Sequence, residues 1–290
     1  MKLRAGGCVG LFALVAGFAQ AQFLYVGNSG DGTISRVDLA GNVSTFATGF
    51  ANIYGLAGDS SGNLYVSSTT AHKVVRITPA GTITDYATDF PSNSSLMGMA
   101  FDSSGNLFVA DVSAGIYKIT PSGTVSLWAT GMSYPRDVAF NDAGVLYAVG
   151  GYNPMTMYSI ASNGTPTLFA SQAANAGFTC IDFGYLDWAH VGGSNSTFYQ
   201  INTSAAVLSY LGQNVTDVVY TGTYASNEAW YFLVGGSLFR DVNGNINTFA
   251  TGFSTPTALA FVAVPEPATT AALIGLLALL AVGVRRRFAE

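Results

Sequence analysis

Cysteine is nearly absent from this sequence of 290 residues: Cys8 lies near the start, and Cys180 is the one cysteine beyond it. A single cysteine cannot form an intramolecular disulfide, which excludes a disulfide-stapled scaffold for the body of the chain. A folded region of this size must then be stabilised by an apolar core.

Charged side chains are also scarce, at 9% of the sequence. Residues 22–264 carry fourteen Asp and Glu against six Lys and Arg, a net charge near −8. Nucleic-acid binding needs basic patches that neutralise phosphates, so this balance argues against a nucleic-acid partner. Molecules that carry the same net charge repel one another, so we predict a soluble monomer.

Long apolar runs occur at the two ends of the chain. Two basic residues within the first four precede an apolar run over 8–19, which ends in Ala19-Gln20-Ala21. This order predicts a secretory signal peptide over 1–21, cleaved after Ala21. The run is too short for a transmembrane helix, which needs about 20 apolar residues.

The second apolar run, 268–284, is uncharged and is followed by Arg285, Arg286 and Arg287. As a helix it would be about 25 Å long, at the short end of what spans a bilayer. Arginines after such a run act as a cytoplasmic anchor. We therefore predict one C-terminal transmembrane helix in the inner membrane, with the body on the periplasmic side.

The region between the two ends repeats. An apolar-x-polar-apolar motif occurs six times ahead of a glycine turn, and its third position recurs in steps of 40, 42, 41, 41 and 40 residues. These positions are Arg36, Arg76, Lys118, Ser159, Gln200 and Arg240. Each copy belongs to four short segments rich in Val, Ile, Tyr, Phe and Thr, which predict four β-strands. Four strands per repeat of this length is the size of a propeller blade.

The two chain ends predict how the ring closes. The body starts with the second strand type, at 23–26, and ends with the innermost type, at 257–262. Pairing the two completes a blade and leaves no exposed edge. We predict an all-β, six-bladed β-propeller over 22–263, with four-stranded blades closed by the N- and C-terminal strands. A two-sheet sandwich, the alternative, requires no uniform period.

Two residue columns within the repeat have a packing and a binding interpretation. Aromatic residues recur on the inner and outer strands, and we expect them to fill the gaps between blades instead of forming a ligand-stacking ladder. The column of Arg36, Arg76, Lys118 and Arg240 could form an anion patch. We expect instead that these long stems lie over a neighbouring blade with their charges in water.

The body resembles the NHL-repeat and gluconolactonase-like family of six-bladed propellers, which includes streptogramin lyases. The resemblance is carried by Gly55-Leu56-Ala57, by the segment DSSGNLYV over 59–66, and by their copies at 98–109. It covers nearly all of 23–262 and implies the fold more than the chemistry, since one fold supports many functions.

The tail over 264–290 resembles a PEP-CTERM sorting signal. Val264-Pro265-Glu266-Pro267, the apolar run and the arginine cluster occur in the order typical of that signal. The resemblance implies a Gram-negative bacterium, recognition and cleavage by an exosortase, passage through the inner membrane, and delivery to the outer surface or the extracellular matrix. A plain membrane anchor is the alternative.

The gluconolactonase-like resemblance implies a divalent metal, such as Ca²⁺ or Zn²⁺, held by carboxylates and an Asn in the central channel. In this sequence the equivalent column reads Gly55, Gly98, Asp137, Cys180, Asp217 and Ala258. It holds two acidic residues, on blades that are not adjacent, and Arg136 stands beside one of them. Hard cations need several converging oxygen ligands, and the family's first Glu has no counterpart. We therefore predict no metal or other cofactor.

One repeat departs from the others, with Cys180 and Asp182 on its innermost strand and His190 after them. A Cys, Asp and His group could be nucleophilic or metal-binding. The alternative is a drifting repeat that holds a hydrogen-bonded core Asp. The DSSG runs at 59 and 102 resemble calcium loops, but we expect turns in which Asp caps backbone N–H groups and Gly takes a positive φ.

The candidate channel or ligand site consists of Arg136, Asp137, Cys180, Asp182, His190 and Asp217. No convergent acid–base or metal set is evident among them. Our first hypothesis is an exported, non-catalytic surface or matrix module that binds a polysaccharide, a protein or a small molecule. The alternative is an exported lactonase- or lyase-like enzyme with a divalent-metal site in its channel.

Overall fold

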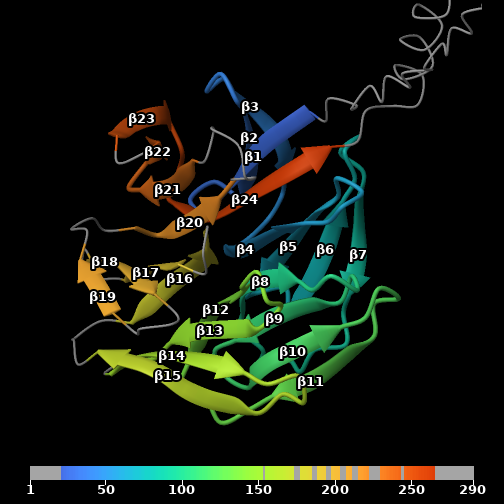
Figure 1. Ribbon diagram of the computed structural model, residues 1–290. Coiled ribbons are helices and arrows are strands. Elements are labelled where there is room, and N and C mark those ends of the chain that lie inside the picture. The colour runs from blue at the N-terminus through green and yellow to red at the C-terminus, as the bar shows by residue number, and fades with distance from the viewer. Residues whose placement is uncertain are drawn as a thin grey trace, which may run out of the picture. The chain divides into compact units, whose positions relative to one another are not determined.

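The computed structural model describes residues 21–152, 154–172, 177–184, 188–193, 197–202, 207–210, 215–221, 229–242 and 245–264. Residues 22–264 form one compact unit. It is built from six four-stranded sheets, which we call blades 1 to 6 (Figure 1).

Each blade is listed from its inner to its outer strand. Blade 1 is β24 (Pro256–Val264), β1 (Ala21–Asn28), β2 (Thr33–Asp38) and β3 (Val43–Thr48). Blade 2 is β4 (Ile53–Gly58), β5 (Leu64–Ser68), β6 (Lys73–Ile77) and β7 (Ile83–Ala87). Blade 3 is β8 (Leu96–Phe101), β9 (Leu107–Asp111), β10 (Gly115–Ile119) and β11 (Val125–Ala129).

The other three blades follow the same order. Blade 4 is β12 (Pro135–Phe140), β13 (Leu146–Gly150), β14 (Met155–Ile160) and β15 (Pro166–Gln172). Blade 5 is β16 (Phe178–Phe183), β17 (Trp188–Gly193), β18 (Thr197–Asn202) and β19 (Val207–Tyr210). Blade 6 is β20 (Asp217–Tyr220), β21 (Trp230–Val234), β22 (Ser237–Val242) and β23 (Asn245–Thr251).

The inner strands form a closed ring. They contact one another in the order β4, β8, β12, β16, β20, β24 and back to β4 (Figure 1). The last strand, β24, pairs with the first, β1, within blade 1. The predicted six-bladed propeller, its four-stranded blades and its closure by the two chain ends are all confirmed.

The predicted terminal segments lie almost wholly outside the described residues. Ala21 is the first residue of β1 and Val264 the last of β24, whereas Ala19, Pro265-Glu266-Pro267 and Arg285 to Arg287 fall outside the described part. Nowhere in that described part is there a helix with the length and apolar character to cross a membrane. The span predicted over 268–284 also falls outside it.

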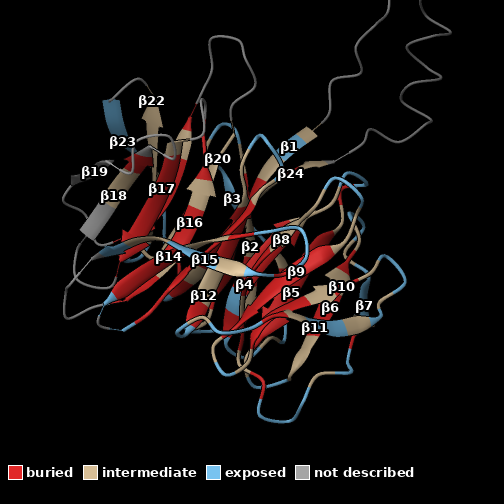
Figure 2. Ribbon diagram, turned by 60° about the horizontal axis from the view of Figure 1, so that its bottom comes forward, coloured by how far each residue is buried: buried red, intermediate tan, exposed pale blue. Residues whose placement is uncertain are grey.

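The core lies between the blades, and one recurring aromatic trio shows how it is built. Tyr65 of β5 meets Tyr86 of its own blade at 4.7 Å between ring centroids and Phe101 of blade 3 at 4.9 Å, both edge to face. Phe108, Trp128 and Phe140 repeat this arrangement one blade further on. Edge-to-face pairs add to the energy of burial, so the aromatic columns pack blades together, as predicted. Figure 2 shows the buried strands at the centre of the fold.

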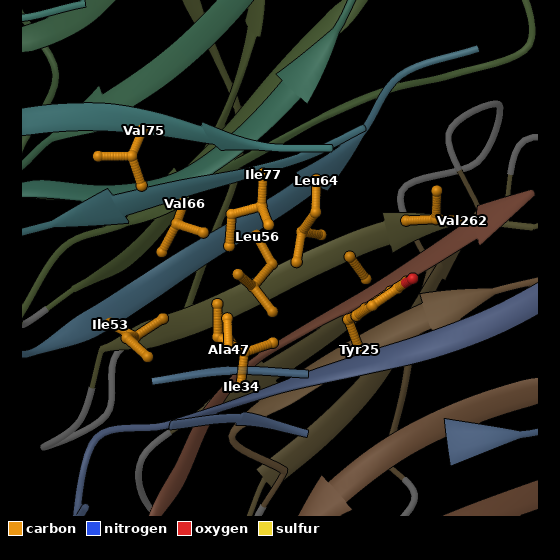
Figure 3. Packing of buried hydrophobic residues seen from close by; sticks show 12 residues of the cluster. Tyr25, Ile34, Ala47, Ile53, Leu56, Leu64, Val66, Val75, Ile77 and Val262 are labelled. Carbon is orange, nitrogen blue, oxygen red and sulfur yellow. The ribbon is translucent and has the colours of Figure 1, made fainter. Parts of the chain in front are cut away.

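The interface between blades 1 and 2 contains the closing strand (Figure 3). Tyr25 and Ile34 of blade 1 and Val262 of β24 pack against Ile53 and Leu56 of blade 2, and all five are buried. Full burial of such a side chain contributes about 1.5–3 kcal/mol. Closure of the ring is therefore stabilised by apolar packing as well as by strand pairing.

The basic column of the third strands differs from the prediction. The Arg36 Cζ lies 4.7 Å from the Phe23 ring centroid and 5.9 Å from that of Phe46, both in its own blade. Arg240 likewise covers Tyr231 and Phe249 of its own blade. For these two arginines, an aromatic residue on each flanking strand of the same blade provides a surface for the guanidinium.

The DSSG loops are turns, as predicted. Asp59 Oδ1 accepts hydrogen bonds from the N–H groups of Ser61 and Asn63, both at 2.9 Å, and Gly62 has a φ of 82°. Asp102 repeats the pattern in the next blade. The carboxylates are occupied by the turn itself, since Asn63 Nδ2 also donates to the Asp59 Oδ2 at 2.8 Å.

We predict that removing β24 abolishes cooperative folding. A chain of residues 22–252 would leave β1 without its pairing strand and β4 and β20 without a neighbour in the inner ring, whereas residues 22–264 retain β24. Urea denaturation followed by circular dichroism should give a single steep transition for the longer chain and a shallow one for the shorter. Equal transitions would contradict closure as a requirement for folding.

Candidate functional site

A cavity of about 270 Å³ lies at the axis of the ring, and all six inner strands contribute to its wall. Propellers commonly enclose such a channel at their axis. Asp137, Asp182 and Asp217, three of the six predicted site residues, line this cavity. They come from β12, β16 and β20, on three successive blades.

Each of these carboxylates joins two blades. Asp137 Oδ1 accepts a hydrogen bond from its own neighbour, the Val138 N–H, at 2.8 Å, and Oδ2 accepts one from the Ile181 N–H of the next blade, also at 2.8 Å. When the carboxyl is ionised, hydrogen bonds of this kind are charge-assisted and stronger than neutral ones. The Asp137 side chain is therefore a linker between blades 4 and 5.

The other two carboxylates repeat this geometry. Asp182 accepts from Phe183 N–H at 2.9 Å and from Tyr220 N–H of blade 6 at 2.6 Å. Asp217 accepts from Val218 N–H at 2.8 Å and from Leu259 N–H of the closing strand at 2.5 Å. The hydrogen-bonded core role, left open for Asp182, holds for all three.

Glycine stands in this column where a side chain would collide with the next inner strand. A Cβ added to Gly98 would lie 1.7 Å from the Asp137 Oδ1, and one added to Gly55 would lie 2.2 Å from the Met97 carbonyl oxygen. A larger residue at either position would push adjacent inner strands apart. The column of glycines and aspartates thus reflects strand spacing.

Burial changes the acidity of the three carboxyls. Burial raises the pKa of Asp137 to about 7, with the N–H donors of Ile181 and Val138 opposing the rise. Burial likewise raises the pKa of Asp182 to about 7 and that of Asp217 well above its usual range, where the charge of Asp137 adds to the effect. Carboxyls titrating near neutral pH can act as general acids or bases.

Asp182 stands opposite His190 in the pairing of β16 with β17, and Cys180 lies two residues earlier on the same face of β16. Cys180 is buried among Val215, Val218 and Phe232, and burial raises the pKa of its thiol well above the usual range, so the nucleophilic thiolate is disfavoured. The His190 ring lies 3.5 Å from that of Trp230, and burial lowers its pKa to about 3. Both side chains lie in the interface between blades 5 and 6.

One mouth of the channel is bordered by the residues that start the inner strands. A cavity of about 260 Å³ is lined there by Tyr54, Met97, Arg136, Thr179, Val215, Thr216 and Thr257. Arg136 is the charged member of this set, which draws on all six blades. Sequence reasoning singled out Arg136 as a neighbour of Asp137 but missed the ring of residues around it.

The predicted site residues therefore divide into three groups. Three aspartates line the channel, Arg136 borders its mouth, and Cys180 and His190 face a blade interface. Within the described residues, no group of three or more His, Cys, Asp or Glu side chains is placed to hold a metal ion.

The raised pKa of Asp182 predicts a pH-dependent stability difference. The folded carboxyl stays protonated up to about pH 7, whereas the unfolded one ionises near pH 4. The folded state therefore binds more protons in this window, and the contribution of Asp182 to stability falls as pH rises. His190, neutral when folded, contributes with the opposite sign below pH 6.5, so wild type must be compared with a variant.

We expect the unfolding free energy of wild type, less that of Asp182→Asn, to fall by about 1–3 kcal/mol between pH 5 and pH 8. Urea denaturation at each pH measures this difference. Asp85→Asn, which alters an exposed ion pair with Lys73, is the control and should show no such change over this range. A difference that stays constant across this range would show that the folded Asp182 is already ionised at pH 5.

Comparisons with known proteins place the fold. No protein-family model and no curated protein matches the chain. Among solved structures, virginiamycin B lyase from Staphylococcus aureus is 17% identical with a TM-score of 0.59, over 80% of this chain and 85% of its own. A protein assigned to the gluconolactonase family is 14% identical with a TM-score of 0.56, over 79% of this chain and 89% of its own.

A third similar structure is the PQQ-bound aldose sugar dehydrogenase from Streptomyces coelicolor. It is 14% identical with a TM-score of 0.60, over 74% of this chain and 85% of its own. At these identities the likeness concerns the fold alone. The chain has the six-bladed β-propeller fold that streptogramin B lyases and gluconolactonase-like proteins also have.

Proposed function

We propose that the protein binds a polar ligand in its central channel, entered at the mouth bordered by Tyr54, Arg136 and Thr216. The observation that carries this proposal is the continuity of the mouth with the axial cavity: Tyr54, Thr179, Thr216 and Thr257 line both. Ligand sites are typically concave, with a few polar groups set among apolar ones.

The binding site would be displayed outside the cell. The signal peptide over 1–21 and the sorting tail over 264–290 support export, recognition by an exosortase, transient residence in the inner membrane, and delivery to the outer surface or extracellular matrix. A polysaccharide, a protein or a small molecule would then be the ligand. Mass spectrometry of the mature C-terminus, in strains with and without the exosortase, tests this part of the proposal.

Catalysis in the channel is the second candidate, and the comparisons favour it over a purely non-catalytic module. The named neighbours include a lyase, a member of the gluconolactonase family and a sugar dehydrogenase. The channel also holds Asp137 and Asp182, whose pKa values of about 7 suit proton transfer near neutral pH. Against this stands the use of both oxygens of each carboxylate in linking blades.

A channel-blocking variant tests the binding proposal. Thr216→Trp places an indole in the mouth, and Thr84→Trp, on the exposed outer strand β7, is the matched control. In a thermal-shift screen of sugars and organic acids, we expect at least one compound to raise the Tm of wild type and Thr84→Trp but not of Thr216→Trp. Equal shifts in all three proteins would place the ligand outside the channel.

The same compounds separate binding from catalysis. A stabilising ligand recovered unchanged after prolonged incubation supports binding alone, whereas a product whose rate of formation falls in Asp182→Asn supports an enzyme. We expect added Ca²⁺ or Zn²⁺ to leave the Tm unchanged, because the channel carboxylates already accept backbone hydrogen bonds. A rise of several degrees that is lost in Asp137→Ala would instead support the metal-dependent enzyme.

A further inference from the structure

Arg136 carries unused hydrogen-bonding capacity at the channel mouth. Its Nε is buried and has no acceptor among the described residues. The one ion pair within the described part of the chain joins Lys73 to Asp85, so no described carboxylate neutralises the guanidinium. Leaving a buried donor unpaired is unfavourable, and a ligand that accepts hydrogen bonds from the guanidinium would offset that cost.

The threonine hydroxyls of the mouth are occupied. The Thr179 hydroxyl donates to the Gly192 carbonyl at 3.2 Å, and the Thr216 hydroxyl to the Leu233 carbonyl, also at 3.2 Å. Thr257 contacts the Ile53 carbonyl of the neighbouring blade. The threonines therefore hold strands together, and the arginine is the strong donor left to face the cavity.

Position separates Arg136 from the other arginines with a buried Nε. Arg76 and Arg240 also lack an acceptor at this atom among the described residues. Arg240 lies over the rings of Tyr231 and Phe249, and neither arginine belongs to the wall of the mouth cavity. Arg136 borders that cavity and also a second one outside it.

This second cavity supplies exposed aromatic surface. It measures about 620 Å³ and is lined by Val112, Ser133, Tyr134, Arg136 and Tyr152. Tyr134 is 57% exposed and Tyr152 is 67% exposed. Tyr134 has a φ of 47°, a left-handed conformation that Asn52 and Thr255 adopt ahead of other inner strands. A bulky residue rarely adopts it, and here it places a tyrosine beside the arginine.

The combination defines a ligand class. A guanidinium pairs with a carboxylate through two parallel hydrogen bonds, and exposed tyrosines offer rigid, partly apolar surfaces to a ring. A carboxylated sugar has both features on one unit. We propose that Arg136, flanked by Tyr134 and Tyr152, binds the carboxylate of a uronic acid, either free or within a glycan. This inference rests on the proposed channel binding and names its ligand class.

Calorimetric titration of the full-length protein in mild detergent tests this assignment. The probes are glucuronate, glucose, and a glucuronate-containing oligosaccharide, which separates a free sugar from a glycan as the source. We expect glucuronate to bind at least about tenfold more tightly than glucose, since the neutral sugar forfeits the charged pair. Tighter binding of the oligosaccharide than of glucuronate indicates that the ligand is a glycan. Equal affinity for the two probes indicates the free sugar.

Variants locate the carboxylate contact. Arg136→Gln should weaken glucuronate binding about tenfold or more while leaving glucose binding unchanged, and Arg136→Lys should fall between it and wild type. Lys118→Gln removes a positive charge from an outer position over Phe108 and should change neither affinity. No glucuronate binding, or equal loss in Arg136→Gln and Lys118→Gln, would overturn the assignment.

The two proposals fail in different ways. In one outcome, glucuronate and glucose bind equally, Arg136→Gln changes neither affinity, and Thr216→Trp abolishes the binding of both sugars. The channel then binds ligand, but the arginine assignment is wrong. If Thr216→Trp leaves glucuronate binding intact while Arg136→Gln abolishes it, the site lies in the outer cavity and the proposed channel function is wrong.

Discussion

Close contact between neighbouring inner strands is the constraint on which the rest of this structure depends. Six strands must converge on one axis, and the last of them, β24, comes from the opposite end of the chain from its partner β1. At two of the contacts the chain uses glycine, because a Cβ at Gly55 or Gly98 would collide with the next strand. At three others it uses an aspartate that accepts a backbone N–H across the gap. Both solutions answer the same geometric demand.

The aspartate solution has an electrostatic consequence. Three carboxyls around one narrow cavity lose hydration, which raises the pKa of each, and the charges of neighbouring aspartates raise the pKa values of Asp137 and Asp217 further. Backbone donors offset the rise only in part. A strongly shifted carboxyl pKa is usually taken as a sign of an active site. Here the same acidity arises from holding blades together, so a raised pKa does not by itself separate a catalyst from a structural linker.

Much of the architecture could be predicted because it is periodic in the sequence. The regular step between third strands gave the blade number, and the strand types at the chain ends gave the closure. The role of Asp137 could not be predicted, since its partner Ile181 is 44 residues away and is brought near by the ring alone. The channel mouth was missed for the same reason. Its one signal was an arginine at a position where the other repeats have Tyr54, Met97 or a threonine.

The acidity of the body bears on how an anionic ligand would be recognised. With a net charge near −8 over residues 22–264, the long-range field repels a carboxylate, so steering cannot account for binding. Recognition would rest on short-range contacts with Arg136, whose guanidinium has no ion-pair partner among the described residues. Such a site would select for the geometry of one carboxylate and reject polyanions in general. An acidic surface of this kind would favour specificity over tight non-specific adhesion to polyanions.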